Sequence, residues 1–207
     1  MATLPRRLTR CSLPLKVDRM CRHLAQFYDE TYPAETVSEF FASGLEAGDN
    51  CLALLTAAHR RAVEQCLQAR GIVVERAAYV AVDSDDAWSQ MQADGRLDLR
   101  RAHDLLAPLM KAPAGRGKRR VRAVGDLAPT LCAAGKTDDA VAFERLVHRL
   151  TKEHGASTIC AYPIQSHRGE NGMHALLRLS AEHAVIEFPQ RQWVQHLMPS
   201  VPSRANA

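Results

Sequence analysis

The sequence lacks the features that mark several large classes of protein. No apolar run approaches the about 20 residues that a membrane-spanning helix needs. The basic start of the chain is broken by prolines and charged residues, so it does not indicate a secretory signal. The net charge of +4 is too small to indicate nucleic-acid binding unless the excess is concentrated in one segment. The 207 residues, 46% of them hydrophobic, suit one globular domain with short tails, expected in the cytoplasm.

The cysteines form no recognisable disulfide or metal pattern. The six lie far apart, at Cys11, Cys21, Cys51, Cys66, Cys132 and Cys160. No C-x-x-C motif is present, and Cys11, Cys21 and His23 lack a second ligand pair at zinc-finger spacing. We therefore expect free thiols in a reducing compartment, no metal site and no cofactor. A redox switch with Cys21 as its sensor is a further hypothesis, which depends on the exposure and pKa of that thiol.

A complete phosphate-binding loop is also missing. Gly135-Lys136-Thr137 copies the end of such a loop, but Thr130 stands where the earlier glycine is needed. The preceding apolar run ends at Gly125, too early for a loop that joins a strand directly to a helix. This motif therefore favours an ordinary helix start.

Short apolar runs alternate with amphipathic segments along the chain. The runs predict strands at Cys51–Thr56, Tyr79–Asp83, Val121–Gly125, Ser157–Tyr162 and His183–Phe188. The amphipathic segments predict helices from Tyr32 to Gly48, Thr56 to Gly71, Leu99 to Met110 and Thr137 to Gly155, with Thr56 and Thr137 as N-caps. This alternation predicts an α/β fold with a mainly parallel sheet flanked by helices. Residues 1–21 would form an arm, 22–188 the domain and 189–207 a flexible tail.

The segment from His23 to Asp29 combines an imidazole, two adjacent aromatic rings and a carboxylate. Phe27 and Tyr28 would wall a small-ligand pocket if His23 and Asp29 served as its polar anchors. The alternative is a packed strand with both rings in the core, and the residues alone leave both open. Farther along, the spacing of Glu144 and His148 is typical of an (i, i+4) pair on an exposed helix face.

Basic residues gather in one segment beside Gly115 and Gly117. They are Arg116, Lys118, Arg119, Arg120 and Arg122. No aromatic residue is interleaved for base stacking, and no helix-turn-helix or zinc module surrounds them. The segment is interpreted either as a solvated loop or as a contact with an acidic partner, made by Arg116, Lys118, Arg119 and Arg120.

The order of several short motifs resembles the MEDS family, a sensory domain of methanogen and methylotroph signalling proteins and of the dichloromethane-responsive regulator. The first motifs are His23, Phe27-Tyr28, Phe40-Phe41 and Gly44–Asp49, followed by the strand at Cys51. The later ones are Gly71-Ile72, Asp83, Asp94–Asp98, Arg122–Asp126, Phe143-Glu144 and Ile159–Tyr162. The resemblance covers about residues 22–188.

The resemblance implies a fold like that of the RecA/KaiC ATPases without the phosphate-binding loop. The segment from Phe27 to Thr36 takes the place of that loop and contains no glycine or lysine, so ATP hydrolysis is not expected. The family also implies a sensory role, often beside a DNA-binding or kinase module. Because the flanking residues are too few for such a module, we expect a stand-alone member that does not bind DNA directly.

We therefore predict a cytoplasmic sensory module, not an enzyme, that acts on a separate histidine kinase or transcription regulator. Its small organic ligand would contact His23, Phe27, Tyr28, Asp126 and Tyr162, the last two because ligands of parallel sheets bind beyond the carboxyl ends of strands. The alternative is a divergent nucleotide-binding protein or enzyme that uses Asp126, Glu144 or Lys136.

Overall fold

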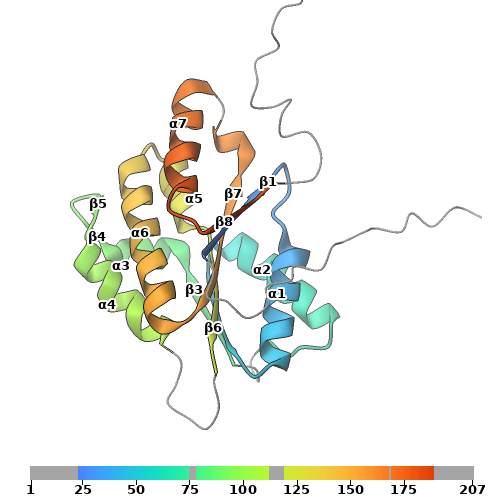
Figure 1. Ribbon diagram of the computed structural model, residues 1–207. Helices are drawn as coiled ribbons and strands as arrows, with labels where there is room; N and C mark the ends of the chain where they lie inside the picture. The colour runs from blue at the N-terminus through green and yellow to red at the C-terminus, as the bar shows by residue number, and fades with distance from the viewer. Residues whose placement is uncertain (1–22, 75–77, 112–118, 168, 189–207) are drawn as a thin grey trace, which may run out of the picture.

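The computed structural model describes residues 23–74, 78–111, 119–167 and 169–188. Within these residues, a six-stranded sheet lies between two layers of helices (Figure 1). The strand order is β3-β2-β6-β7-β1-β8, and every neighbouring pair is parallel. The strands are β1 (His23–Tyr28), β2 (Asn50–Leu55), β3 (Tyr79–Asp83), β6 (Val121–Gly125), β7 (Ser157–Pro163) and β8 (Val185–Glu187). The predicted α/β class is confirmed.

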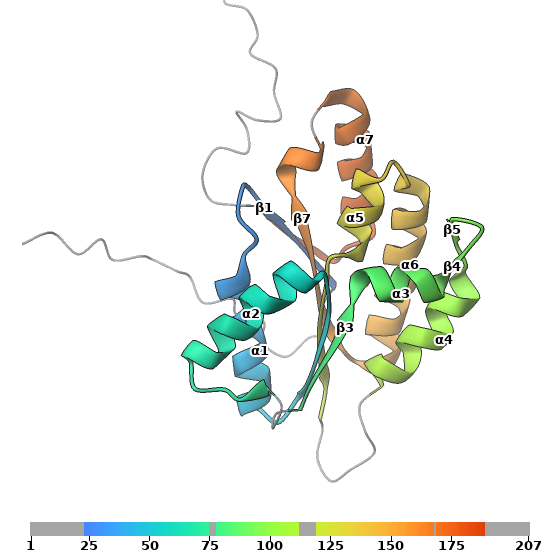
Figure 2. The same ribbon diagram turned by 180° about the vertical axis from the view of Figure 1, so that it is seen from behind.

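The path of the chain decides which helices cover which face. From β1 the chain moves outward to β2 and β3, and α1 (Ala34–Glu46) and α2 (Ala57–Ala69) cover one face. It then returns through β6 and β7 to β8, so right-handed crossovers place the later helices on the opposite face (Figure 2). These are α3 (Ser84–Met91), α4 (Leu99–Met110), α5 (Leu127–Ala133), α6 (Thr137–His154) and α7 (Gly169–Ser180).

Two smaller features accompany the main sheet and its helices. A short antiparallel hairpin, β4 (Gln92–Ala93) and β5 (Arg96–Leu97), separates α3 from α4. The 3-10 helix η2 (Ile164–His167) follows β7. None of the described helices is long and apolar enough to cross a membrane.

Two of the predicted helix caps need correction. Thr137 is the first residue of α6 rather than its N-cap, and Lys136 takes the cap position without a side-chain cap bond. Thr56 is the N-cap of α2, but its hydroxyl donates to Asp126 Oδ2 at 3.1 Å instead of accepting from the helix. The predicted end of α6 is confirmed, because Gly155 adopts the left-handed conformation with φ of 63°.

Candidate functional site

Polar side chains from two neighbouring strands share one face of the sheet. In the parallel pair of β1 and β7, His23 lies opposite Thr158, Ala25 opposite Cys160 and Phe27 opposite Tyr162. Since side chains two residues apart in a strand point the same way, Cys160 and Tyr162 share a face with Thr158. This face lies under the helix layer that contains α6.

Glu144 enters this layer from α6. It lies in the same stripe as Ala140, Phe143 and Val147, at the spacing that places residues on one helix face. Its side chain is fully buried. The expectation of an exposed Glu144–His148 pair is therefore wrong, and the partners of Glu144 are histidines from other elements.

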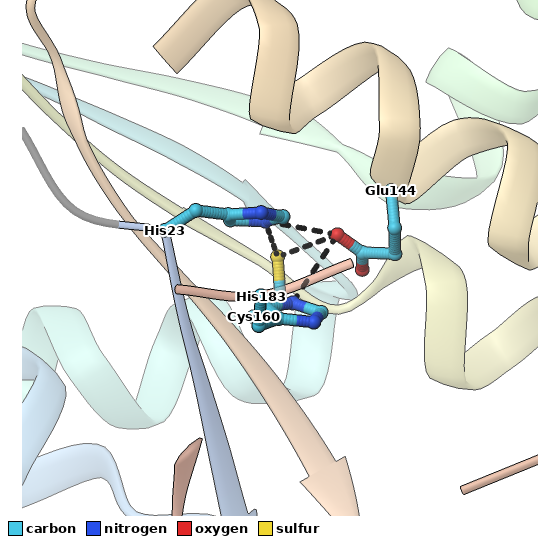
Figure 3. A group of neighbouring side chains, drawn as sticks. All are labelled: His23, Glu144, Cys160 and His183. Atoms are coloured by element: carbon cyan, nitrogen blue, oxygen red, sulfur yellow. Dashed lines mark hydrogen bonds and ion pairs between the residues drawn. The ribbon is translucent and has the colours of Figure 1, made fainter. Parts of the chain in front are cut away.

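Four side chains converge on one point beneath α6 (Figure 3), and we call them the His23–Glu144–Cys160–His183 cluster. His23 Nε2 lies 3.0 Å from Glu144 Oε2 and 3.3 Å from Cys160 Sγ. The Cys160 thiol donates to Glu144 Oε2 at 3.3 Å, and His183 Nε2 lies 3.4 Å from the same oxygen. Each donor comes from a different part of the chain: β1, α6, β7 and the turn between α7 and β8.

Each end of the cluster is held by further hydrogen bonds. The phenolic hydroxyl of Tyr162 donates to the other carboxylate oxygen of Glu144. Nδ1 of His23 lies 3.2 Å from the Glu182 carbonyl oxygen, and Nδ1 of His183 lies 2.8 Å from the Leu179 carbonyl oxygen. Because a carbonyl can only accept, both Nδ1 atoms carry a proton and both Nε2 atoms face Glu144.

The electrostatics of the cluster favour an ionised carboxylate. Burial alone would raise the pKa of Glu144, but His183 and His23 beside it hold that pKa below its usual value. Burial would lower the pKa of His183, and the neighbouring carboxylate raises it instead. Burial and Glu144 both raise the pKa of the Cys160 thiol and of the Tyr162 phenol, so these two groups stay protonated in the absence of another cation.

An apolar pocket lies beside the cluster, between the sheet and the helix layer. The pocket has a volume of about 30 Å³. Since one water molecule needs about 10–15 Å³, the pocket has room for a very small molecule. Glu144 and Cys160 form part of its wall. The other lining residues are Leu52, Leu54, Leu106, Met110, Ala123, Val124, Gly125, Leu127, Ala128, Phe143, Val147 and Thr158.

Asp126 lies elsewhere, at the carboxyl ends of β2, β3 and β6. Its carboxylate accepts hydrogen bonds from the backbone N–H and hydroxyl of Thr56 and from the Ser84 hydroxyl. Nδ1 of His59 is a further donor, 2.6 Å from Oδ2. The His59 ring stacks on Tyr32 with centroids 3.9 Å apart. Asp126 thus joins three loops, and these bonds occupy most of its acceptor sites.

Of the other predicted ligand residues, Phe27 lies in the core, and Tyr28 lies near Asp126 at the end of β1. Phe27 is 1% exposed and stacks with Tyr162 and Phe188, so this ring lies in the core as the packed-strand alternative expects. Tyr28 is half-buried at the end of β1, where burial and then Asp126 raise its pKa to about 12. The structure therefore brings His23 and Tyr162 to one cluster and Tyr28 and Asp126 to another region.

The basic residues that the structure describes have different surroundings. Arg116 and Lys118 lie outside the described residues, Arg119 is exposed, and the backbone N–H of Arg120 donates to Asp49 Oδ1. Arg122 pairs with Asp49 at 3.0 Å and donates to the Phe40 carbonyl oxygen. Arg122 is thus part of the packing between β6 and α1, while the partner contact predicted for the other four stays a prediction.

The cysteines of the described residues are free, as expected. Burial raises the pKa of Cys51 to about 12 and that of Cys132 to about 11, which disfavours the reactive thiolate. Cys21, the residue of the redox hypothesis, lies outside the described part of the chain.

The parallel sheet, its two helix layers and the buried polar cluster beneath α6 define an α/β domain. Residues 22–179 match the family model of MEDS, the MEthanogen/methylotroph, DcmR Sensory domain. The chain belongs to the MEDS family, a family of sensory rather than catalytic domains. No curated protein matches the chain.

Sequence reasoning missed Glu144, Cys160 and His183 as members of the cluster. The signal for Glu144 was present, because a carboxylate lies in the same 3.6-residue stripe as Ala140, Phe143 and Val147. His183 gave no such signal, since it lies in a turn between two elements. The four donors match no metal-binding motif because they come from distant parts of the sequence.

Proposed function

We propose that this chain is a cytoplasmic sensory module that binds a small organic ligand and relays its presence to a separate histidine kinase or transcription regulator. The observation that carries the proposal is the apolar pocket in the core, which has Glu144 and Cys160 in its wall. A pocket that is mostly apolar with a few polar groups is typical of small-molecule sites. Membership of a sensory family supports the same role.

The position of the pocket provides a route for the signal. Its wall includes residues of α4, α5 and α6 on one side and of β2, β6 and β7 on the other. A ligand that fills the pocket would therefore change how these helices pack on the sheet, and a signal requires such a difference in affinity between two packings. The predicted ligand contacts His23 and Tyr162 would act through Glu144, which both of them touch.

The partner contact is proposed for the segment after α4. Met110, at the end of α4, lines the pocket, and the chain then runs into Arg116, Lys118, Arg119 and Arg120 before β6 begins. A change in the packing of α4 would thus reach these four basic residues along the chain. Their charge suits an acidic surface on the partner protein.

The residues of the nucleotide-binding alternative have other roles in the fold. Lys136 donates to the Gly95 carbonyl oxygen at 2.8 Å and lies 4.7 Å from the centre of the Trp88 ring. Asp126 joins three loops, and Glu144 is fully buried. These contacts favour the binding module, so isothermal titration with ATP and Mg²⁺ should give no heat above dilution.

Thermal unfolding in the presence of dichloromethane tests ligand binding. A ligand at one hundred times its dissociation constant stabilises the fold by about 2.7 kcal/mol, which raises the melting temperature measurably. Ala123→Val adds two methyl groups to the pocket wall and should remove this stabilisation. Ala81→Val, on β3 and away from the pocket, is the matched control and should keep it.

No shift with dichloromethane, or the same shift in both variants, would contradict binding in the pocket. The relay is tested by capturing proteins on the immobilised chain from the cells that produce it, with and without dichloromethane. A histidine kinase or transcription regulator should be retained in a dichloromethane-dependent way. Reversing the charge of Arg116, Lys118, Arg119 and Arg120 should abolish its capture, and unchanged capture would refute the assigned contact.

A further inference from the structure

We propose that His23, Glu144, Cys160 and His183 bind a divalent transition metal ion, with Zn²⁺ the ion that the donor set fits best. The four residues offer two imidazole nitrogens, one carboxylate oxygen and one sulfur, all within 4.8 Å of one another (Figure 3). These are the ligand types that zinc prefers. This site does not depend on the proposed small-molecule ligand.

The spacing of the donors matches a four-coordinate site. Zinc–ligand bonds of about 2.0–2.3 Å place neighbouring tetrahedral donors about 3.3–3.8 Å apart. Glu144 Oε2 lies 3.0 Å from His23 Nε2, 3.3 Å from Cys160 Sγ and 3.4 Å from His183 Nε2. His23 Nε2 and Cys160 Sγ are 3.3 Å apart. Small side-chain rotations are therefore enough to surround an ion.

In their neutral forms, both histidines would present an Nε2 lone pair to the same point. Their Nδ1 atoms face the carbonyl oxygens of Glu182 and Leu179, which leaves Nε2 of each ring free to coordinate in the neutral tautomer. The side chain of His183 has no exposed surface, and its Nε2 faces Glu144 Oε2 at 3.4 Å, the long end of the hydrogen-bond range. A buried imidazole nitrogen at this distance from a carboxylate oxygen and near a thiol leaves space for an ion between these atoms.

A divalent ion would also balance the charge of the cluster. Glu144 is fully buried, and a buried carboxylate needs a compensating positive charge. When Cys160 binds a metal it loses its thiol proton to solvent, so one thiolate and one carboxylate cancel the two positive charges of the ion. The alternative occupant is a proton shared among the same atoms.

Tyr162 would serve as a positioning residue for the metal ligands. Its hydroxyl donates to the Glu144 oxygen that does not face the histidines, which fixes the plane of the carboxylate. Together with the two backbone carbonyls, this bond gives three of the four ligands an outer partner. Such partners orient the ligands of metal sites, and their loss usually weakens metal affinity about 10–100-fold.

Titration of the chelator-treated, tag-free chain with Co²⁺ tests the site. One equivalent should produce the intense visible bands of four-coordinate Co²⁺ and a near-ultraviolet band from thiolate-to-metal charge transfer, and Zn²⁺ should remove both. Cys160→Ser should abolish the charge-transfer band. Tyr162→Phe should keep that band but weaken Co²⁺ binding about 10–100-fold. Cys51→Ser is the matched control, because Cys51 is also buried but lies on the opposite face of the sheet.

The wild-type titration alone can overturn the proposal. Absence of the visible and charge-transfer bands would show that protons rather than a metal balance Glu144. A charge-transfer band that persists in a folded Cys160→Ser variant, or that disappears in Cys51→Ser, would assign the metal to another thiol. Dichloromethane binding is measured separately, so loss of the metal site would leave the pocket proposal untouched.

Discussion

Phe27 illustrates how one side chain can support two interpretations until its neighbours are known. Its position after His23 and beside Tyr28 is compatible with a pocket wall, but it is 1% exposed. Its ring lies 5.3 Å from that of Tyr162 and 4.8 Å from that of Phe188, both in stacked arrangements. Phe27 therefore packs the sheet against the helix layer that covers the cluster.

Replacement of Phe27 by alanine should destabilise the domain by about 3–5 kcal/mol, because it removes a buried aromatic ring and leaves a cavity. Urea denaturation followed by circular dichroism measures this loss. Phe27→Leu, which keeps most of the buried volume, should cost clearly less. A Phe27→Ala variant that unfolds at the wild-type urea concentration but no longer responds to dichloromethane would instead assign Phe27 to a binding wall.

Glu144 shows the limit of sequence reasoning at the scale of single residues. The amphipathic pattern places it on the buried face of its helix, while a carboxylate beside a histidine four residues later is more often exposed. What decides its burial is the presence of His23, His183 and Tyr162 in the fold. Those three residues are distant from Glu144 in the sequence, so local sequence patterns could not predict that they surround its carboxylate.

Whole elements were easier to predict than single contacts. The long helix α6 and the buried strands β2 and β7 carry a periodic apolar pattern over enough residues to reveal their type. The helices α3 and α5 were not predicted, since 8 and 7 residues span too few turns to show a helical period. The helix α7 was missed although it has 12 residues, because it begins with Gly169 and contains Asn171 and Gly172.

The end of α6 gives a prediction at the scale of an element. Gly155 has φ of 63°, a conformation that costs an alanine about 1 kcal/mol. Gly155→Ala should therefore lower the free energy of unfolding by about 1 kcal/mol, measured by urea denaturation. Gly155→Asn is the control, because asparagine tolerates this conformation better. Equal stability of Gly155→Ala and the wild type would show that the helix ends differently in solution.

At the scale of the whole molecule, the cluster and the pocket share a wall. Glu144 and Cys160 contribute to both, and the helices that cover them also form most of the core on that face. On the proposed function, a ligand bound at this wall would change how the helix layer packs on the sheet. The opposite layer, formed by α1 and α2, has its own core and should respond little.

Methyl-resolved NMR during titration with dichloromethane tests the central claim most directly. The methyl signals of Leu106, Met110 and Leu127 should shift and saturate, because these side chains line the pocket. Those of Val63 and Leu67, in the core on the other face of the sheet, should not move. The absence of any saturable shift, or shifts confined to the face under α1 and α2, would contradict ligand binding in this pocket.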